Sequence, residues 1–292
     1  STLFPYTTLF RSPYRAGTTN LRQERHKELL SRARGVTIDD AQMFTFDTMV
    51  AVTRAWAHQA AVLLPRRVDV AEGSEVADLA AMAAELAEFD GRFDSHSAGA
   101  LYTTLILESV ARDVSPDLRV RLAANIQAGV SLSQEEREAL RTAALNARGE
   151  LKARCGTVLR NLGDVFRVGR GSVSTASSGL NLILRGPPGR AFTGGLNFLQ
   201  LAAPQANTYS GWMDGCRRER NGGTRAPMLV GFGEPLQSFS LLAFGVSDDP
   251  ASPHFSDQSL LAGRERLRPN FFDAADLRDN LTSVTRRRTE LK

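Results

Sequence analysis

Hydrophobic residues recur every three to four positions through the first half of the chain, and this spacing predicts amphipathic helices. The clearest case follows Thr37, where an apolar stripe continues until Pro65 ends the helix. The stripe consists of Phe46, Met49, Val50, Trp56, Ala57, Ala60, Leu63 and Leu64. Thr37 and Asp40 resemble a capping box in which aspartate replaces the usual glutamate or glutamine. The pattern therefore predicts one helix over 37–64, with Trp56 in the core.

Further helices are expected on both sides of this one, because the same spacing and local end signals continue to about residue 155. Ser133 and Glu136 form a second capping box, which opens the last helix of the series. A linker at 66–75 and a break at 89–91 separate the helices. Their predicted ranges are 19–34, 76–88, 97–113, 116–129 and 133–155.

The composition of the chain changes after Gly156, where glycine, serine and proline become frequent and the helical period is lost. Strand-like runs at 227–232 and 237–244 are separated by the turn residues 233–235. In the second run Phe239, Leu241 and Ala243 alternate with residues 238, 240 and 242, which predicts a mostly buried strand pair. A short helix over 273–285 closes the chain. The predicted class is α+β, with a helical region at 18–155 and a strand-rich region at 156–292.

Composition narrows the function classes. The 292 residues are 42% hydrophobic and 23% charged, as in an ordinary globular protein, and the formal net charge is only +4. Basic residues are scattered except at 286–288, which we interpret as a solvated helix end, so nothing favours nucleic-acid binding. No apolar run approaches the roughly 20 residues that span a bilayer.

The two cysteines, Cys155 and Cys216, are too few for a disulfide scaffold. They could pair in an oxidising compartment, but we expect two unpaired thiols. Neither cysteine has a CxxC partner, and the histidines at 26, 58 and 96 are isolated, so no zinc site is predicted.

Residues 1–12 lack any helical or strand period and repeat Thr-Leu-Phe at 2–4 and 8–10. They do not have the basic n-region, the long apolar h-region or the small-residue cleavage site of a signal peptide. They resemble the translated read-through of a sequencing adapter, so we expect genuine sequence to begin near Pro13, at 13–292. The alternative is a natural apolar N-terminal arm.

His254 and Asp257 invite a catalytic interpretation, because histidine is the usual general base. A Ser-His-Asp triad also needs a presented serine, and Gly-x-Ser-x-Gly is absent from the chain. We therefore expect a structural histidine, braced by a turn that Pro250 and Pro253 stiffen. Asp248 and its neighbour are interpreted as turn acids.

This turn also carries a family resemblance. The run Asp-Pro-Ala-Ser-Pro-His-Phe-x-Asp-Gln at 249–258, followed by Arg-Leu-Arg-Pro at 266–269, resembles the closing segment of the penicillin-acylase family of N-terminal-nucleophile amide hydrolases. Within that family it is most similar to the acyl-homoserine-lactone and aculeacin acylases. Further stretches match in the right order, although several family aromatics and one glutamine are replaced. These stretches are Arg22-x-x-Arg25, Thr45-x-Asp47, Phe89-Asp90-Gly91 with Asp94, and 162–168.

The resemblance implies a fold and a chemistry. The family fold is an αββα sandwich, and its reaction cleaves an acyl-amide bond of a penicillin, an acyl-homoserine lactone or a lipopeptide. The nucleophile is the N-terminal residue of a mature β chain, and its own α-amine is the general base. The family's Gly-Ser-Asn nucleophile motif is absent here. We therefore expect the C-terminal part of an acylase β chain, inactive without the α chain and the start of the β chain.

One site residue carries over from the family, Arg22, which the resemblance places beside the active site. There it helps to hold the nucleophile and the oxyanion-hole asparagine. The alternative is a solvated helix arginine. No cofactor or metal site is expected in this chain, although the resemblance allows calcium in the intact parent. The expected location is the periplasm or the exterior. The competing function is a non-catalytic helical binding or scaffold protein with a small β cap.

Overall fold

The computed structural model describes residues 21–66, 71, 73–179, 183–185, 191–193, 211–213, 215–219 and 226–281. At 21–24, 26, 183–185 and 191–193 the description covers the backbone alone. The adapter-like segment 1–12, the arginine run 286–288 and the last part of the predicted closing helix, 282–285, lie outside these ranges.

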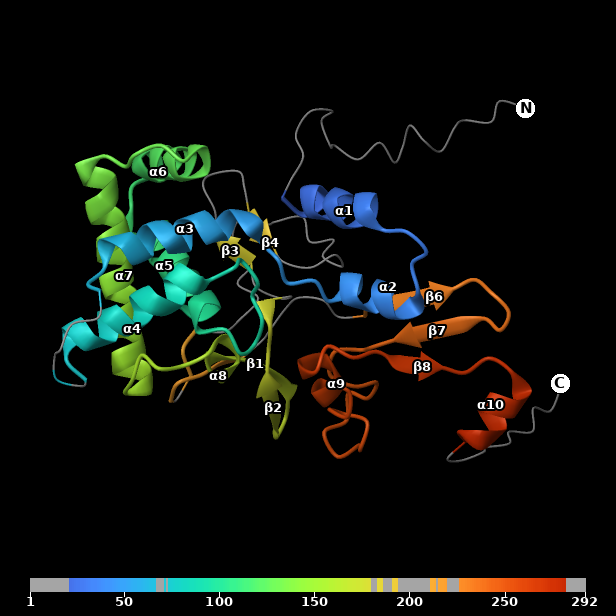
Figure 1. Ribbon diagram of the computed structural model, residues 1–292. Coiled ribbons are helices and arrows are strands. Elements are labelled where there is room, and N and C mark those ends of the chain that lie inside the picture. Colours follow the sequence, from blue (N-terminus) through green and yellow to red (C-terminus); the bar gives the residue numbers. More distant parts are fainter. Residues whose placement is uncertain are drawn as a thin grey trace, which may run out of the picture.

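Helices fill the first half of the chain and short strands dominate the second, so the predicted α+β class is confirmed (Figure 1). The helices are α1 (Leu21–Arg32), α2 (Ile38–Thr45), α3 (Ala51–Leu63), α4 (Glu75–Glu88), α5 (Ala98–Asp113), α6 (Pro116–Ala128), α7 (Gln134–Cys155), α8 (Leu162–Val165), α9 (Ser259–Gly263) and α10 (Ala274–Asp279). The strands are β1 (Phe166–Arg170), β2 (Val173–Ala176), β3 (Ile183–Arg185), β4 (Ala191–Thr193), β5 (Arg218–Glu219), β6 (Met228–Gly231), β7 (Gln237–Ser240) and β8 (Arg268–Asn270).

Helices α3 to α7 pack around one apolar centre, which we call the helical core. It lies on the left of Figure 1. Helix α5 is at its centre, because every residue from 99 to 107 is buried. A helix with apolar or small residues on all sides is covered on all sides. Trp56 is 2% exposed, which confirms the prediction that it belongs to the core.

Local sequence signals set the helix ends. Both predicted capping boxes are present. The Thr37 side chain accepts from the Asp40 N–H, and the Ser133 side chain accepts from the Glu136 N–H. In return, each carboxylate accepts from the backbone N–H of its cap residue. Gly129 and Gly156 end α6 and α7 with φ of 66° and 70°, a left-handed conformation that favours glycine. The predicted helices over 76–88, 97–113, 116–129 and 133–155 are all confirmed.

The prediction of a single helix over 37–64 is wrong in its middle. The chain leaves the helix after Thr45 and starts α3 at Ala51. Between them the Val50 N–H donates to the Gly91 carbonyl at 2.8 Å, and the Phe93 N–H donates to the Thr48 carbonyl at 3.2 Å. The backbone of 48–50 thus pairs with 91–93 instead of continuing a helical ladder. The spacing of apolar residues does not indicate this partner, because it lies more than 40 positions away in the sequence.

Three small sheets are formed within the described residues, with strand orders β2-β1-β5, β3-β4 and β6-β7-β8. Strands β6 and β7 confirm the predicted hairpin, but β7 ends at Ser240 and the pair is not mostly buried. Ser238 is buried, whereas Phe239 is partly exposed. The reason is a polar contact across the sheet, because Asn270 on β8 donates to Ser238 Oγ at 3.0 Å and accepts from Ser240 Oγ at 2.8 Å.

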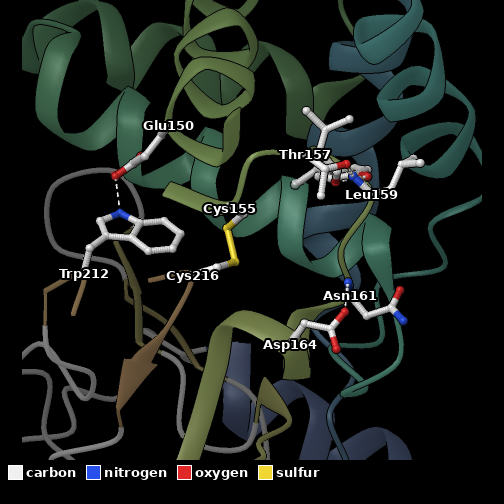
Figure 2. Close-up of a disulfide and its surroundings, with 10 residues drawn as sticks. Glu150, Cys155, Thr157, Leu159, Asn161, Asp164, Trp212 and Cys216 are labelled. Carbon is white, nitrogen blue, oxygen red and sulfur yellow. Dashed lines mark hydrogen bonds between the residues drawn. A yellow bond between two sulfur atoms is a disulfide. The ribbon is translucent and has the colours of Figure 1, made fainter. Parts of the chain in front are cut away.

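The expectation of two unpaired thiols is also wrong. Cys155, the last residue of α7, forms a disulfide with Cys216, 61 positions later in the sequence (Figure 2). Beside it the Trp212 indole N–H donates to the Glu150 carboxylate on α7. Arg218 in β5 also pairs with Glu108 on α5, at 2.7 Å. We call these three links the disulfide clamp. It holds the described part of 211–219 on the helical core, a pairing that spacing along the chain does not reveal.

In the described part of the chain, no helix is both long enough and apolar enough to cross a membrane.

Candidate functional site

A two-point ion pair joins helix α1 to the segment between α2 and α3. On α1, Arg25 Nε donates to Asp47 Oδ2 at 2.8 Å, and its Nη2 donates to Oδ1 at 2.9 Å. Asp47 is only 5% exposed. A bidentate guanidinium–carboxylate pair fixes direction as well as distance, because both donors lie in one rigid plane. This pair therefore sets how α1 lies against the rest of the molecule.

A second arginine and a second aspartate extend this pair. Arg92 Nη1 lies 3.7 Å from Asp47 Oδ1, and Arg92 Nε lies 3.3 Å from Asp94 Oδ2. Thr48, next to Asp47, donates its hydroxyl to Asp94 Oδ1 at 2.5 Å. We call Arg25, Asp47, Arg92 and Asp94 the arginine–aspartate junction. Each carboxylate has at least one cationic partner, which is the condition for holding such charge away from water.

Gly91 brings the second pair of junction residues close to the first. Its φ is +96°, and a Cβ at this position would lie 3.2 Å from Met49 Sδ and 3.4 Å from the Val50 carbonyl oxygen. Met49 and Arg92 form an isolated antiparallel bridge there. A residue with a side chain would strain the backbone at this φ and crowd the bridge. The Phe-Asp-Gly stretch is thus a tight turn that positions Arg92 and Asp94.

The fourth motif stretch packs directly after the junction. The Gly163 N–H donates to the Ser95 carbonyl at 2.6 Å, and the Leu162 N–H donates to the Ser97 carbonyl at 3.0 Å. A Cβ on Gly163 would lie 2.7 Å from Ala176 Cβ and 2.9 Å from Ser95 Cβ, so no side chain fits there. The stretches at 45–47 and 162–168 therefore both contact residues 91–97, and Asp47 links α1 to them.

The electrostatics of Arg25 suit a positioning role better than a role in proton transfer. The hydrogen bonds to Asp47 raise the pKa of Arg25 well above its ordinary range, and burial only partly opposes this rise. A guanidinium with so high a pKa stays charged at every physiological pH. Arg25 can therefore orient and neutralise groups, but its guanidinium does not act as a general acid or base.

Glu265 is a feature of this region that sequence reasoning missed. It follows α9 with φ of 55°, uncommon for a residue other than glycine, and its Oε1 is buried without a hydrogen-bond partner in the described residues. Burial raises the pKa of this carboxyl, while a hydrogen bond to Ser178 opposes the rise; Asp94 raises it further and Arg92 lowers it. No local pattern marks Glu265, because its environment comes from distant segments.

Arg22 lies in the first turn of α1, three positions before Arg25. Its side chain is outside the described residues, so the structure gives the place of its backbone alone. The role that the resemblance assigns to Arg22 stays a prediction.

His254 and Asp257 are hydrogen-bonded on the closing turn, with Nδ1 2.9 Å from Oδ2, and the histidine side chain is 63% exposed. Arg170 at the tip of β1 anchors the same turn. It donates to the Ser247 carbonyl at 3.1 Å and lies over the Phe255 ring, 3.9 Å from its centre. These contacts brace the turn against the β1–β2 hairpin, as the interpretation of His254 as a structural residue expects.

An open hollow of about 810 Å³ lies on the helical core, away from the motif residues in sequence. Its lining comes from α5, α6 and α7 and includes Ser109, Asp113 and Asn146. Asp113 keeps a lowered pKa there, chiefly because Arg112 donates hydrogen bonds to it. None of the junction residues lines this hollow.

Comparison with known proteins identifies the family to which this chain belongs. A sequence model of the penicillin amidase family matches residues 4–279, so the chain belongs to that family. The family resemblance seen in the sequence is thereby confirmed, whereas the likeness to the acyl-homoserine-lactone and aculeacin acylases stays a prediction. The match begins at residue 4, within the segment 1–12.

Among solved structures, the chain is similar to a thermostable penicillin G acylase from Alcaligenes faecalis, with 16% sequence identity and a TM-score of 0.40. The alignment covers 92% of this chain and 53% of that one, so the chain spans about half the length of the solved acylase. A search of curated proteins finds no match.

Proposed function

We propose that this chain forms part of an acylase that hydrolyses the amide bond between an acyl group and an amine. The observation that carries the proposal is the family match over 4–279, and it is supported by a structure in which three of the motif stretches meet at the arginine–aspartate junction. Candidate substrates are penicillins, acyl-homoserine lactones and acylated peptides, which share the amide that the reaction breaks.

The proposed chemistry needs a nucleophile from outside this chain. A serine, threonine or cysteine at the start of a mature β chain attacks the amide carbonyl, and its own α-amine accepts the proton. The α-amine passes this proton to the leaving amine as the C–N bond breaks, and water then hydrolyses the acyl enzyme to release the acid and the free nucleophile. An asparagine amide and a backbone N–H then stabilise the oxyanion. Arg22 supports this step as a fixed positive charge with several donors, which orients the asparagine without transferring a proton. Residues 22–281 then provide the frame that holds Arg22.

The exposed apolar side chains of the C-terminal region support a longer parent. Large hydrophobic residues are solvent-exposed on and around the β6-β7-β8 sheet, with Phe232 92% and Met228 69% exposed. Others in this region are Leu236, Val246, Leu260, Phe271, Phe272, Leu277 and Leu281. Large apolar side chains exposed in one region of a chain are typical of a surface that further polypeptide covers. In the proposal, the rest of the acylase, including its α chain and the start of its β chain, covers it.

The disulfide supports an oxidising location. Disulfides persist in the periplasm and outside the cell, whereas cytosolic thiols are kept reduced. The bond between Cys155 and Cys216 therefore favours the periplasmic or secreted location that the family resemblance implies. Within the described residues, no three His, Cys, Asp or Glu side chains gather in a way that could hold a metal ion. No step of the proposed chemistry uses calcium.

The test is to express the complete reading frame that contains this chain and to assay the purified protein with chromogenic amides of short and long acyl chains. Hydrolysis of at least one amide is expected, and replacing Arg22 with leucine should lower kcat/KM by about 10²-fold, as the loss of an oxyanion-hole donor does. Arg32→Leu is the control on the same helix, because its side chain is 78% exposed. A processed, folded protein that cleaves none of the amides would refute the acylase and favour a non-catalytic helical binding protein.

A further inference from the structure

Helix α1 is held in an unusual way for a helix that packs on a protein. A docked helix normally buries an apolar stripe. Here the described side chains of α1, at 25 and 27–32, are all at least partly exposed, and Leu30 is 61% exposed. The strongest described contact of α1 with another segment is the two-point pair between Arg25 and Asp47. Among the described contacts of α1, a polar one therefore fixes its orientation.

We propose that Asp47 is a positioning residue for Arg22. This inference rests on the proposed function, because it assumes that Arg22 serves the acylase site. Arg22 precedes Arg25 by three positions, so the two residues lie on neighbouring turns of one rigid helix. A rotation of α1 by one residue would break both hydrogen bonds to Asp47 and would carry Arg22 away from its site.

The surroundings of Asp47 make it a fixed anchor. It is 5% exposed. Besides Arg25, which precedes it in the sequence, it has a second cationic partner in Arg92, which follows it, with Nη1 3.7 Å from Oδ1. The neighbouring residue, Thr48, is tied to Asp94 through its hydroxyl. The carboxylate is thus held by its own segment and by 91–94, and it presents both oxygens to Arg25. A buried carboxylate with two cationic partners has little freedom to follow a moving helix.

A matched control exists within the helical core. Asp78 on α4 is 7% exposed and also has two cationic partners, with Arg148 Nη2 at 2.9 Å and Lys152 Nζ at 3.2 Å. Asp47 and Asp78 therefore share residue type, burial and pairing. Asp78 joins α4 to α7 and has no part in holding α1. Removing the charge from either residue takes the most buried partner from two partly exposed cations and should lower the melting temperature similarly.

The experiment compares Asp47→Asn with Asp78→Asn in the complete, active acylase. Both variants should melt several degrees earlier. Only Asp47→Asn should lower kcat, by about 10²-fold, with KM changed little, because a misplaced group near the chemistry reduces turnover at this scale. If the kcat of folded Asp47→Asn stays within twofold of that of Asp78→Asn, the inference is wrong.

A second variant covers the case in which Asp47→Asn does not fold. Arg25→Lys keeps the charge and removes the bidentate geometry, so kcat should fall several-fold while the protein stays folded. An unchanged kcat in Arg25→Lys would overturn the positioning role. An inactive wild-type protein would refute the proposed function instead, so the two failures are distinguishable.

Discussion

The helical core and the β6-β7-β8 sheet differ in which side chains they bury. In the core, α5 is surrounded by its neighbours, and Leu101, Leu122 and Leu140 are fully covered. In the β6-β7-β8 sheet, the covered face of β7 includes the polar Ser238, while Phe232 beyond β6 is almost fully exposed. The centre of the core is apolar and covered, whereas around the sheet large apolar side chains lie outside and the polar Ser238 lies inside.

The difference indicates that the sheets depend more than the helices on contacts with segments distant in sequence. Core helices are specified by apolar spacing and by caps close in sequence, so most of their bonds are local. Each strand of a small sheet needs partners from elsewhere, and short strands with few partners are marginal by themselves. The disulfide clamp is where the core supports the second region directly.

The largest expected effect comes from breaking this support. Replacing Cys155 and Cys216 together by serine should lower the free energy of unfolding by about 4 kcal/mol, because a cross-link across 61 positions restricts the unfolded chain. Hydrogen exchange should show that amides of 211–219 lose protection while those of α5 keep it. Chemical denaturation of the wild-type protein with and without reductant is the control. An unchanged denaturation midpoint in both experiments would contradict the clamp.

A smaller but still large effect is expected within the core. Leu101→Ala removes a fully buried side chain and should cost about 3 kcal/mol through lost burial and a residual cavity. The matched substitution in the second region, Leu236→Ala, removes a side chain that is 45% exposed and should cost less than about 0.5 kcal/mol. Denaturation of both variants measures the difference. Equal costs would mean that the two regions are not packed differently.

The same comparison explains what could be predicted from the sequence. The helix ends at Ser133 and Gly156 and the burial of Trp56 follow from local patterns, and the structure confirms them. The break at 46–50 and the disulfide do not follow, because each depends on a partner that sequence separation hides. Arg25 and Asp47 were visible only as motif members, and their direct contact needed the three-dimensional structure.

The smallest effect concerns pH and the buried acid near the junction. Burial raises the pKa of Glu265 in the folded protein above its value in the unfolded chain. The folded state therefore favours the protonated carboxyl, and the stability from this group is full below the unfolded pKa and is lost as pH rises through the folded pKa. Glu265→Gln should match the wild type in acid and should be more stable near neutral pH.

Thermal melts from pH 4 to 8 measure this difference, and Glu234→Gln, at an exposed glutamate, is the control. A Glu265→Gln variant that loses stability relative to the wild type as pH rises would show that the buried carboxylate is favourable when charged.

The central claim is that residues 22–281 frame an acylase site whose nucleophile comes from elsewhere in the protein. The most direct measurement is to treat the complete protein with a reactive sulfonyl fluoride and to locate the covalent label by mass spectrometry. We expect loss of amidase activity and a single label on the first residue of a mature chain, before Arg22. Inactivation with the label on a serine or threonine within 22–281 would contradict it.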